Sequence, residues 1–90
     1  MRLMRAITFN AMYHVYILET AAPPIKRYVG FTRDLRTRLH DHNEGKNRST
    51  ASLLPWRLRT YVGFADKKRA LAFESYLKSG SGHAFLYKRL

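Results

Sequence analysis

The chain has 90 residues, for which we expect one compact domain and no second one. Hydrophobic residues make up 46% of the chain and cysteine is absent, so we expect a fold held by its apolar core, without disulfides or a thiolate zinc site. Lys and Arg number 17 against 6 acids, and the formal net charge of +11 favours a polyanionic partner, nucleic acid in the first place. The alternative is a basic surface that serves only solubility.

Residues 1–11 lack the apolar core of a signal peptide, and the chain contains no apolar run of about 18 residues that could span a membrane. We therefore expect a cytoplasmic protein without a membrane partner. Met12 directly precedes the first strand-like stretch. We interpret residues 1–11 as a dispensable N-terminal extension and residues 12–90 as the single domain.

A β-hairpin is predicted after this extension. The segments YHVYIL (13–18) and RYVGF (27–31) are rich in β-branched and aromatic residues, and the Ala-Ala-Pro-Pro between them cannot continue an inner strand. Because side chains alternate along a strand, Tyr28 and Gly30 share one face of the second strand. The hydroxyl of Tyr28 and that of Tyr16 on the first strand can then lie on the same side of the hairpin.

A helix and a third strand follow the hairpin. The stretch TRDLRTRLHDHNEG predicts a helix with Thr32 or Asp34 as its N-cap and Gly45 as its end. Residues 46–55 are polar and typical of a loop. The next segment, WRLRTYVGF (56–64), returns to strand character.

A second helix is predicted to begin after Asp66 and to end at Gly80. The periodicity of the tail, GHAFLYKRL, does not decide between a short third helix and a strand. The order β-β-α-β-α, with this undecided tail, indicates a small α/β (α+β) domain with a mainly antiparallel sheet covered by helices.

Each predicted helix carries a polar residue in its apolar stripe. Positions 35, 38, 39 and 42 share one helix face and read Leu, Arg, Leu, His, whereas 70, 73, 74 and 77 read Ala, Phe, Glu, Leu. An unpaired buried guanidinium costs on the order of several kcal/mol. Arg38 and Glu74 therefore either pair as a salt bridge at the rim of the core or line a polar cleft.

The tetrapeptide YVGF occurs twice, at 28–31 and at 61–64. Each copy ends a predicted strand that leads into a helix, where glycine lets the chain turn or another group approach closely. The two following helices share little sequence, so similar backbone roles explain the repetition better than an internal duplication.

Residues in a fixed order resemble the catalytic signature of the GIY-YIG endonucleases. They are VY at 15–16, YVG at 28–30, Arg38, His42 and Glu74. With the segments YVGFTRDLRTRLHDHNEG, PW and ALAFESYLKSGSG, the chain looks most like small stand-alone members related to the amino-terminal nuclease domain of UvrC. The resemblance extends from Tyr13 to about Phe85 and implies a three-stranded antiparallel sheet flanked by helices, as inferred above.

The resemblance implies metal-dependent hydrolysis of phosphodiester bonds in DNA, in a setting such as repair or recombination. Glu74 would be the protein ligand of one divalent ion, Mg²⁺ or Mn²⁺, since both prefer oxygen ligands and retain waters. Arg38 would hold the scissile phosphate and offset the charge that grows in the transition state.

The resemblance also assigns roles to two tyrosines and a histidine. Tyr16 and Tyr28 would position or deprotonate the attacking water, and the choice of base between them stays open. His42, on the face of Arg38, would relay a proton or bind phosphate. The second YVGF has no Arg and His at this spacing, so we expect Tyr61 to be structural.

The chain departs from the family pattern at several positions. His14 replaces the first glycine, and Val15 and Val29 replace the isoleucines. Phe31 stands where UvrC-like members carry a lysine, and no asparagine follows Glu74.

Two alternatives to an autonomous nuclease therefore stay open. One is a catalytically silent nucleic-acid-binding module, and the other is a nuclease subunit that needs a protein partner for targeting. Single-stranded, branched and damaged DNA are all candidate substrates, and RNA is a further candidate.

Overall fold

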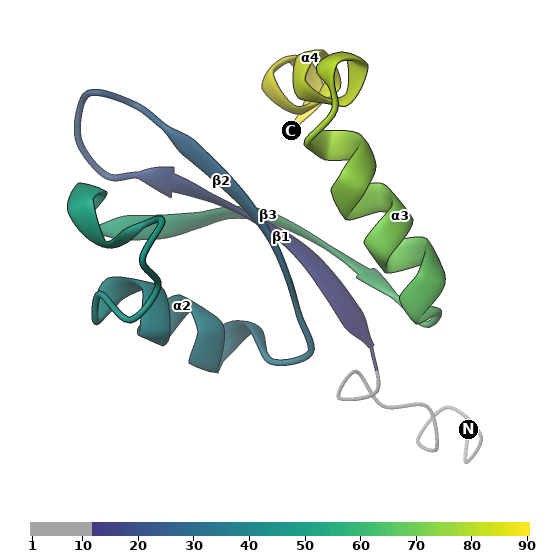
Figure 1. Ribbon diagram of the computed structural model, residues 1–90, viewed down its shortest axis with the longest axis horizontal. Helices are drawn as coiled ribbons and strands as arrows, with labels where there is room; N and C mark the ends of the chain where they lie inside the picture. Colours follow the sequence, from purple (N-terminus) through teal and green to yellow (C-terminus); the bar gives the residue numbers. More distant parts are fainter. Residues whose placement is uncertain (1–11) are drawn as a thin grey trace, which may run out of the picture.

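The computed structural model describes residues 12–90, in which helices flank a three-stranded antiparallel sheet (Figure 1). The strands β1 (Tyr13–Thr20), β2 (Arg27–Thr32) and β3 (Trp56–Phe64) are arranged in the order β2-β1-β3. The helical elements are α2 (Leu35–Asn43), the 3₁₀ turn η2 (Ala51–Leu53), α3 (Lys67–Leu77) and α4 (Gly80–Arg89). The predicted fold class is confirmed, whereas the expected extension at residues 1–11 lies outside the described residues. None of the described helices is long and apolar enough to cross a membrane.

The register of the sheet places both phenols of the hairpin on one face, as predicted. Tyr16 of β1 lies opposite Gly30 of β2, and Leu18 lies opposite Tyr28. Directly opposed residues of an antiparallel pair point to the same side of the sheet. On its other edge β1 pairs with β3, where Tyr61 lies opposite Tyr16. The central Tyr16 is therefore flanked by both copies of YVGF.

Local side-chain chemistry begins the two predicted helices. Of the two candidate caps of α2, Asp34 is the N-cap, and its carboxylate accepts a hydrogen bond from the Thr37 N–H at 3.1 Å. Asp66 caps α3 in the same way, through the N–H of Lys68 at 3.1 Å. Gly45 follows α2 with a φ of 76°, a left-handed conformation that a residue without Cβ adopts at low cost.

The predicted end of the second helix was wrong. α3 ends at Leu77, and Gly80 begins α4 instead of ending α3. Ser79 is the N-cap of α4 and accepts a hydrogen bond from the N–H of Gly82 at 3.3 Å. A Cβ on Gly82 would overlap the carbonyl oxygen of Tyr76, so this glycine permits the close approach of the two helices. The undecided tail is helical.

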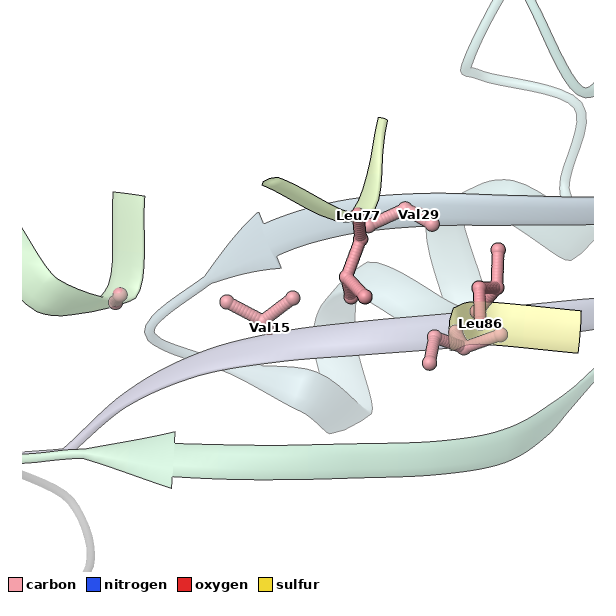
Figure 2. Close-up of a cluster of buried hydrophobic side chains, with 6 residues drawn as sticks. Val15, Val29, Leu77 and Leu86 are labelled. Atoms are coloured by element: carbon pink, nitrogen blue, oxygen red, sulfur yellow. The ribbon is translucent and has the colours of Figure 1, made fainter. Parts of the chain in front are cut away.

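The two faces of the sheet form two separate apolar clusters. The face that packs against α3 and α4 contributes to a core of buried residues, Val15, Ile17, Val29, Ala70, Leu77 and Leu86 (Figure 2). On the opposite face, Leu35 and Leu39 of α2 pack against the buried Tyr16, Leu18 and Trp56. The two phenols of the hairpin thus belong to the α2 face of the sheet.

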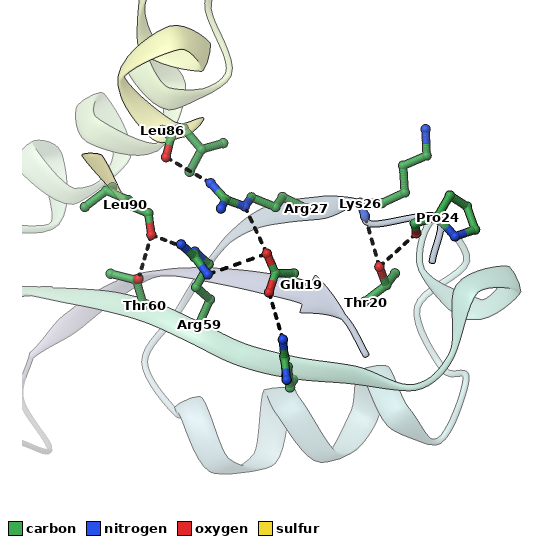
Figure 3. A network of polar contacts seen from close by, with 10 residues as sticks. Glu19, Thr20, Pro24, Lys26, Arg27, Arg59, Thr60, Leu86 and Leu90 are labelled. Carbon is green, nitrogen blue, oxygen red and sulfur yellow. Dashed lines mark hydrogen bonds and ion pairs between the residues drawn. The ribbon is translucent and has the colours of Figure 1, made fainter. Parts of the chain in front are cut away.

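A carboxylate near the end of β1 ties the C-terminal segment to the sheet (Figure 3). Glu19 pairs with Arg57 at 3.2 Å, Arg27 at 3.4 Å and Arg59 at 3.6 Å. Arg27 and Arg59 also donate to backbone carbonyls of the C-terminal segment, at 3.0 Å and 2.7 Å. The hydrogen bond from Arg57, with the charges of Arg59 and Arg27, holds the pKa of Glu19 below its usual value. Glu19 therefore serves the fold and is separate from the predicted site.

Candidate active site

Tyr16 occupies the centre of the site because its ring lies over the glycine of the neighbouring strand. A Cβ added to Gly30 would come within 2.7 Å of the Tyr16 Cε1 atom and closer still to Cζ and the hydroxyl oxygen. Only glycine leaves room for the phenol there. At Gly63, in the second YVGF, the nearest atom is the flexible end of Met12 at 3.2 Å. The first YVGF thus has a packing function that the second does not share.

His42 is fully buried beside Tyr16, and it is the one buried residue of α2, whose other residues are half-buried or exposed. Its Nε2 atom lies 2.9 Å from the Tyr16 hydroxyl oxygen, and its Nδ1 atom lies 2.8 Å from Oγ1 of the buried Thr50. The imidazole therefore bridges β1 and the loop that follows α2. The face of α2 that the sequence predicted to carry His42 is the face turned to the sheet.

Tyr28 lies against the same imidazole. Its ring centroid is 4.9 Å from that of His42 in an edge-to-face arrangement, and its hydroxyl accepts a hydrogen bond from Asn47 at 3.4 Å. Tyr61 differs, because 54% of it is exposed and its ring contacts His14 with the centroids 5.7 Å apart. The two phenols of the predicted site are thus adjacent to His42, and Tyr61 lies outside this group.

Arg38 lies at the solvent-exposed edge of the site. It lines an open hollow of about 130 Å³ together with Asp41, Lys46 and Asn47. Lys46 pairs with Asp41 at 3.6 Å, which leaves the Arg38 guanidinium as the cation of the hollow without a salt bridge among the described residues. Burial raises the pKa of Tyr16, and the charge of Arg38 opposes this increase. An anion entering from solvent would therefore meet Arg38 next to Tyr16.

Glu74 comes from α3, on the other layer of the molecule. Its side chain is 19% exposed, and its Oε2 atom pairs with Lys78 at 3.1 Å. The salt bridge with Arg38 that the sequence left open does not form, since Lys78 takes that place. The carboxylate makes no hydrogen bond or ion pair with Tyr16, Tyr28, Arg38 or His42, but its charge adds to the burial that raises the pKa of Tyr16. The structure thus groups Tyr16, Tyr28 and His42 with Arg38 at their edge, and the membership of Glu74 in this site stays a prediction.

Burial and charge keep both members of the Tyr16–His42 pair neutral. Burial raises the pKa of Tyr16 well above its usual value, the nearby Tyr28 and Glu74 add to this, and Arg38 opposes it. Burial also lowers the pKa of His42, assisted by Arg38 and opposed by Asp41. At neutral pH the site therefore holds a phenol next to an uncharged imidazole.

Reasoning from the sequence missed the residues that hold His42 in place. The indole N–H of Trp56 donates to the Thr50 carbonyl at 2.8 Å. The Asn43 side chain bridges α2 to β3, with bonds of 2.7 Å and 2.9 Å to the Trp56 backbone. Neither Thr50 nor Asn43 belongs to a periodic sequence pattern that would predict its contacts. The one available signal was that a buried indole N–H needs a hydrogen-bond acceptor.

Comparisons with known proteins identify the family of the chain. Residues 12–88 match the model of the GIY-YIG catalytic domain. A UPF0213 protein of Lacticaseibacillus paracasei is 40% identical over 72 residues, which is 79% of each chain. A UPF0213 protein of Streptococcus pneumoniae is 39% identical over 66 residues, and the match covers 72% of this chain and 65% of the relative.

A third relative is much longer. The structure-specific endonuclease subunit SLX1 homologue of Giardia intestinalis is 37% identical over 62 residues, or 64% of this chain and 17% of that protein. No solved structure matches the chain significantly. The match to the catalytic-domain model extends over nearly all of the described residues and includes each of the residues gathered around Tyr16. The chain therefore belongs to the GIY-YIG nuclease family.

Proposed function

We propose that the protein is a divalent-metal-dependent endonuclease that hydrolyses phosphodiester bonds in DNA. The observation that carries this proposal is the contact of Tyr16 and Tyr28 with His42, with Arg38 of the same helix lining an open hollow and the charge of Glu74 in α3 acting on Tyr16. Membership of a nuclease family supports hydrolysis, and the net charge of +11 supports a nucleic acid as the substrate.

Arg38 binds the scissile phosphate in the proposed reaction. Its position at the rim of an open hollow supports this role, because the phosphate can approach from solvent without rearrangement of the fold. A guanidinium placed there offsets the negative charge that grows in the transition state, an effect typically worth about 3 kcal/mol.

The attacking water is activated by Tyr16 and His42. Tyr16 takes a proton from the water and passes its own proton to His42 Nε2, which lies 2.9 Å away. Tyr28 has no such acceptor, because the partner of its hydroxyl among the described residues is the amide of Asn47, which donates. We therefore assign the base to Tyr16 and the orientation of the water to Tyr28.

Glu74 is the residue that would hold the metal. The described residues contain no cluster of three or more His, Cys, Asp or Glu side chains that could bind an ion without substrate. A single accessible carboxylate fits Mg²⁺ or Mn²⁺, which keep several waters and complete their coordination with substrate phosphate oxygens. The ion, when bound, neutralises phosphate charge and increases the acidity of coordinated water. Before an ion binds, Lys78 neutralises the charge of the Glu74 carboxylate, and its largely exposed side chain can move into solvent to make room for the ion.

The position of Glu74 also favours an enzyme over a silent binding module. A carboxylate beside a phosphate site repels the substrate unless a cation lies between them, so a binding protein gains nothing from it. The Giardia relative is a structure-specific endonuclease subunit, which supports a substrate that is recognised by its structure, and a protein partner for targeting. We further propose that the protein acts in DNA repair or recombination in the cytoplasm, as expected from the sequence.

A cleavage assay with a matched pair of variants tests this function. Purified protein is incubated with labelled single-stranded, duplex and branched DNA, and with RNA, in Mg²⁺, Mn²⁺ or EDTA. Glu74→Ala is compared with Glu44→Ala, which removes the same side chain from an exposed position at the end of α2. We expect cleavage by the wild type and Glu44→Ala with metal, and none with EDTA or Glu74→Ala. Binding without cleavage under every condition would favour the silent module.

A further inference from the structure

Thr50 contacts the catalytic histidine from the side opposite Tyr16. Its Oγ1 atom lies 2.8 Å from His42 Nδ1 and 3.4 Å from the Asn47 carbonyl, to which it can donate. Thr50 and His42 are both fully buried, so the contact between them does not compete with water. A chain of hydrogen bonds therefore runs from the Asn47 carbonyl through the Thr50 hydroxyl and the imidazole to the phenol of Tyr16, and its links on both sides of the imidazole are buried.

The hydroxyl of Thr50 takes part in this chain of hydrogen bonds and does not cap the 3₁₀ turn η2 that follows it. Thr50 is the N-cap residue of η2, a position where a threonine hydroxyl usually accepts a hydrogen bond from a backbone N–H. Its side chain makes no such bond. The first turn of η2 therefore lacks a side-chain cap, and the Thr50 hydroxyl contacts His42 instead.

The hydrogen bonds of Thr50 fix which nitrogen of His42 carries the proton. A hydroxyl carries a single proton, and Thr50 directs it to the Asn47 carbonyl. Its oxygen then accepts from His42, which requires the proton of the neutral imidazole to be on Nδ1. Nε2 is left with a free lone pair that faces Tyr16.

The Tyr16 end requires the same direction. The single hydrogen-bond partner of the Tyr16 hydroxyl among the described residues is His42 Nε2, and the nearby charge of Arg38 belongs to a side chain that cannot accept a proton. The O–H of Tyr16 is then free to donate to Nε2 of His42. With the opposite tautomer, His42 Nε2 would point a donor at the Tyr16 oxygen, and the phenol proton would lack an acceptor among the described residues.

We propose that Thr50 is a positioning residue that holds His42 in the tautomer protonated on Nδ1, so that Nε2 can take the proton of Tyr16. Trp56 restrains Thr50 in this position, because its indole N–H donates a hydrogen bond of 2.8 Å to the Thr50 carbonyl oxygen. The effect on the reaction rests on the proposed nuclease function, whereas the tautomer is a property of the protein alone.

Two substitutions separate the hydrogen bond from the packing. Thr50→Val keeps the shape of the side chain and removes the hydroxyl, whereas Thr50→Ser keeps the hydroxyl and removes a methyl group. Histidine ¹⁵N chemical shifts of the full chain, with the His42 signal assigned from its absence in His42→Gln, report which ring nitrogen carries the proton. We expect Nδ1–H in the wild type and Thr50→Ser, and a mixture or the opposite tautomer in Thr50→Val.

Cleavage kinetics supply the second readout. We expect Thr50→Val to lower kcat by about 10²-fold, the lower end of the range for general acid–base catalysis, with KM unchanged. We expect Thr50→Ser to keep a kcat close to that of the wild type. A proton on Nε2 in the wild-type spectrum would overturn the proposal even if the valine variant does not fold. Equal kcat losses in both variants, or an unchanged tautomer in Thr50→Val, would also overturn it. If no variant cleaves DNA but the spectra agree, the nuclease function fails and the tautomer assignment stands.

Discussion

The substitution Gly30→Ala tests the packing on which the site depends. The added methyl group would come within 2.7 Å of Tyr16 Cε1 and closer to its hydroxyl oxygen, whereas Cβ atoms in proteins essentially never approach other atoms within 3.0 Å. The phenol cannot rotate away freely, because Tyr16 is 1% exposed and packs against Leu18 and Trp56. The hydroxyl that bonds to His42 is therefore the part of the side chain that must move.

The size of the effect follows from this overlap. Restoring an ordinary contact of 3.4 Å requires the phenol to retreat by on the order of 1 Å. Overpacking of this kind typically costs about 1–3 kcal/mol of folding stability. A displacement of about 1 Å in a catalytic group can lower the rate by about 10²-fold. We expect Gly30→Ala to show both losses.

Gly63→Ala is the matched control, since it makes the same change in the second YVGF. Its methyl group would meet the flexible end of Met12 at 3.2 Å, and neither glycine has a positive φ. The loss of chain entropy in the unfolded state then makes this variant neutral or more stable, by up to about 1 kcal/mol. Urea denaturation and DNA cleavage are measured for both. Equal stability and equal cleavage in the two variants would refute the argument.

Three further predictions concern single residues. Tyr28→Phe should abolish cleavage without unfolding the protein, while Tyr61→Phe should keep it, and equal activity losses would contradict the assignment. Because burial lowers the pKa of His42, the acid limb of the kcat profile should have its midpoint below the usual value of about 6.5; a midpoint above that value would contradict a buried neutral histidine. The arginines lower the pKa of Glu19, so its stabilisation is complete above its ordinary value of 4.5 and is lost as the pH falls through the lowered folded value. Glu19→Gln should therefore have a lower urea midpoint than the wild type at pH 7, and the two should converge in acid; a difference that is constant with pH would contradict this.

The parts of the fold that were predictable depend on local rules. Asp34 and Asp66 begin their helices because a short carboxylate reaches N–H groups two or three residues further along the chain. Tyr16 and Tyr28 share a face because side chains alternate with a period of two, whatever the rest of the chain does. The periodicity of α2 likewise indicated that His42 lies on the face of Leu35 and Leu39.

The support of the site was not predictable, because it depends on contacts without a period. Thr50 lies in a polar stretch that reads as a loop, and its contact with His42 exists only once Trp56 holds that loop against β3. The start of α4 was missed for a related reason. Gly80 and Gly82 read as the end of a helix, and only the close packing on Tyr76 shows that Gly82 lies inside the next one.

The burial of Tyr16 has a consequence for its proposed role as a base. Its raised pKa excludes a standing phenolate at neutral pH, and substrate phosphate at Arg38 would weaken the one nearby charge that lowers that pKa. A phenol that passes its own proton to His42 while it accepts another from water avoids this difficulty, because no phenolate accumulates. What the reaction then requires is a neutral imidazole with Nε2 directed at the phenol. Burial keeps His42 neutral, and Thr50 directs it.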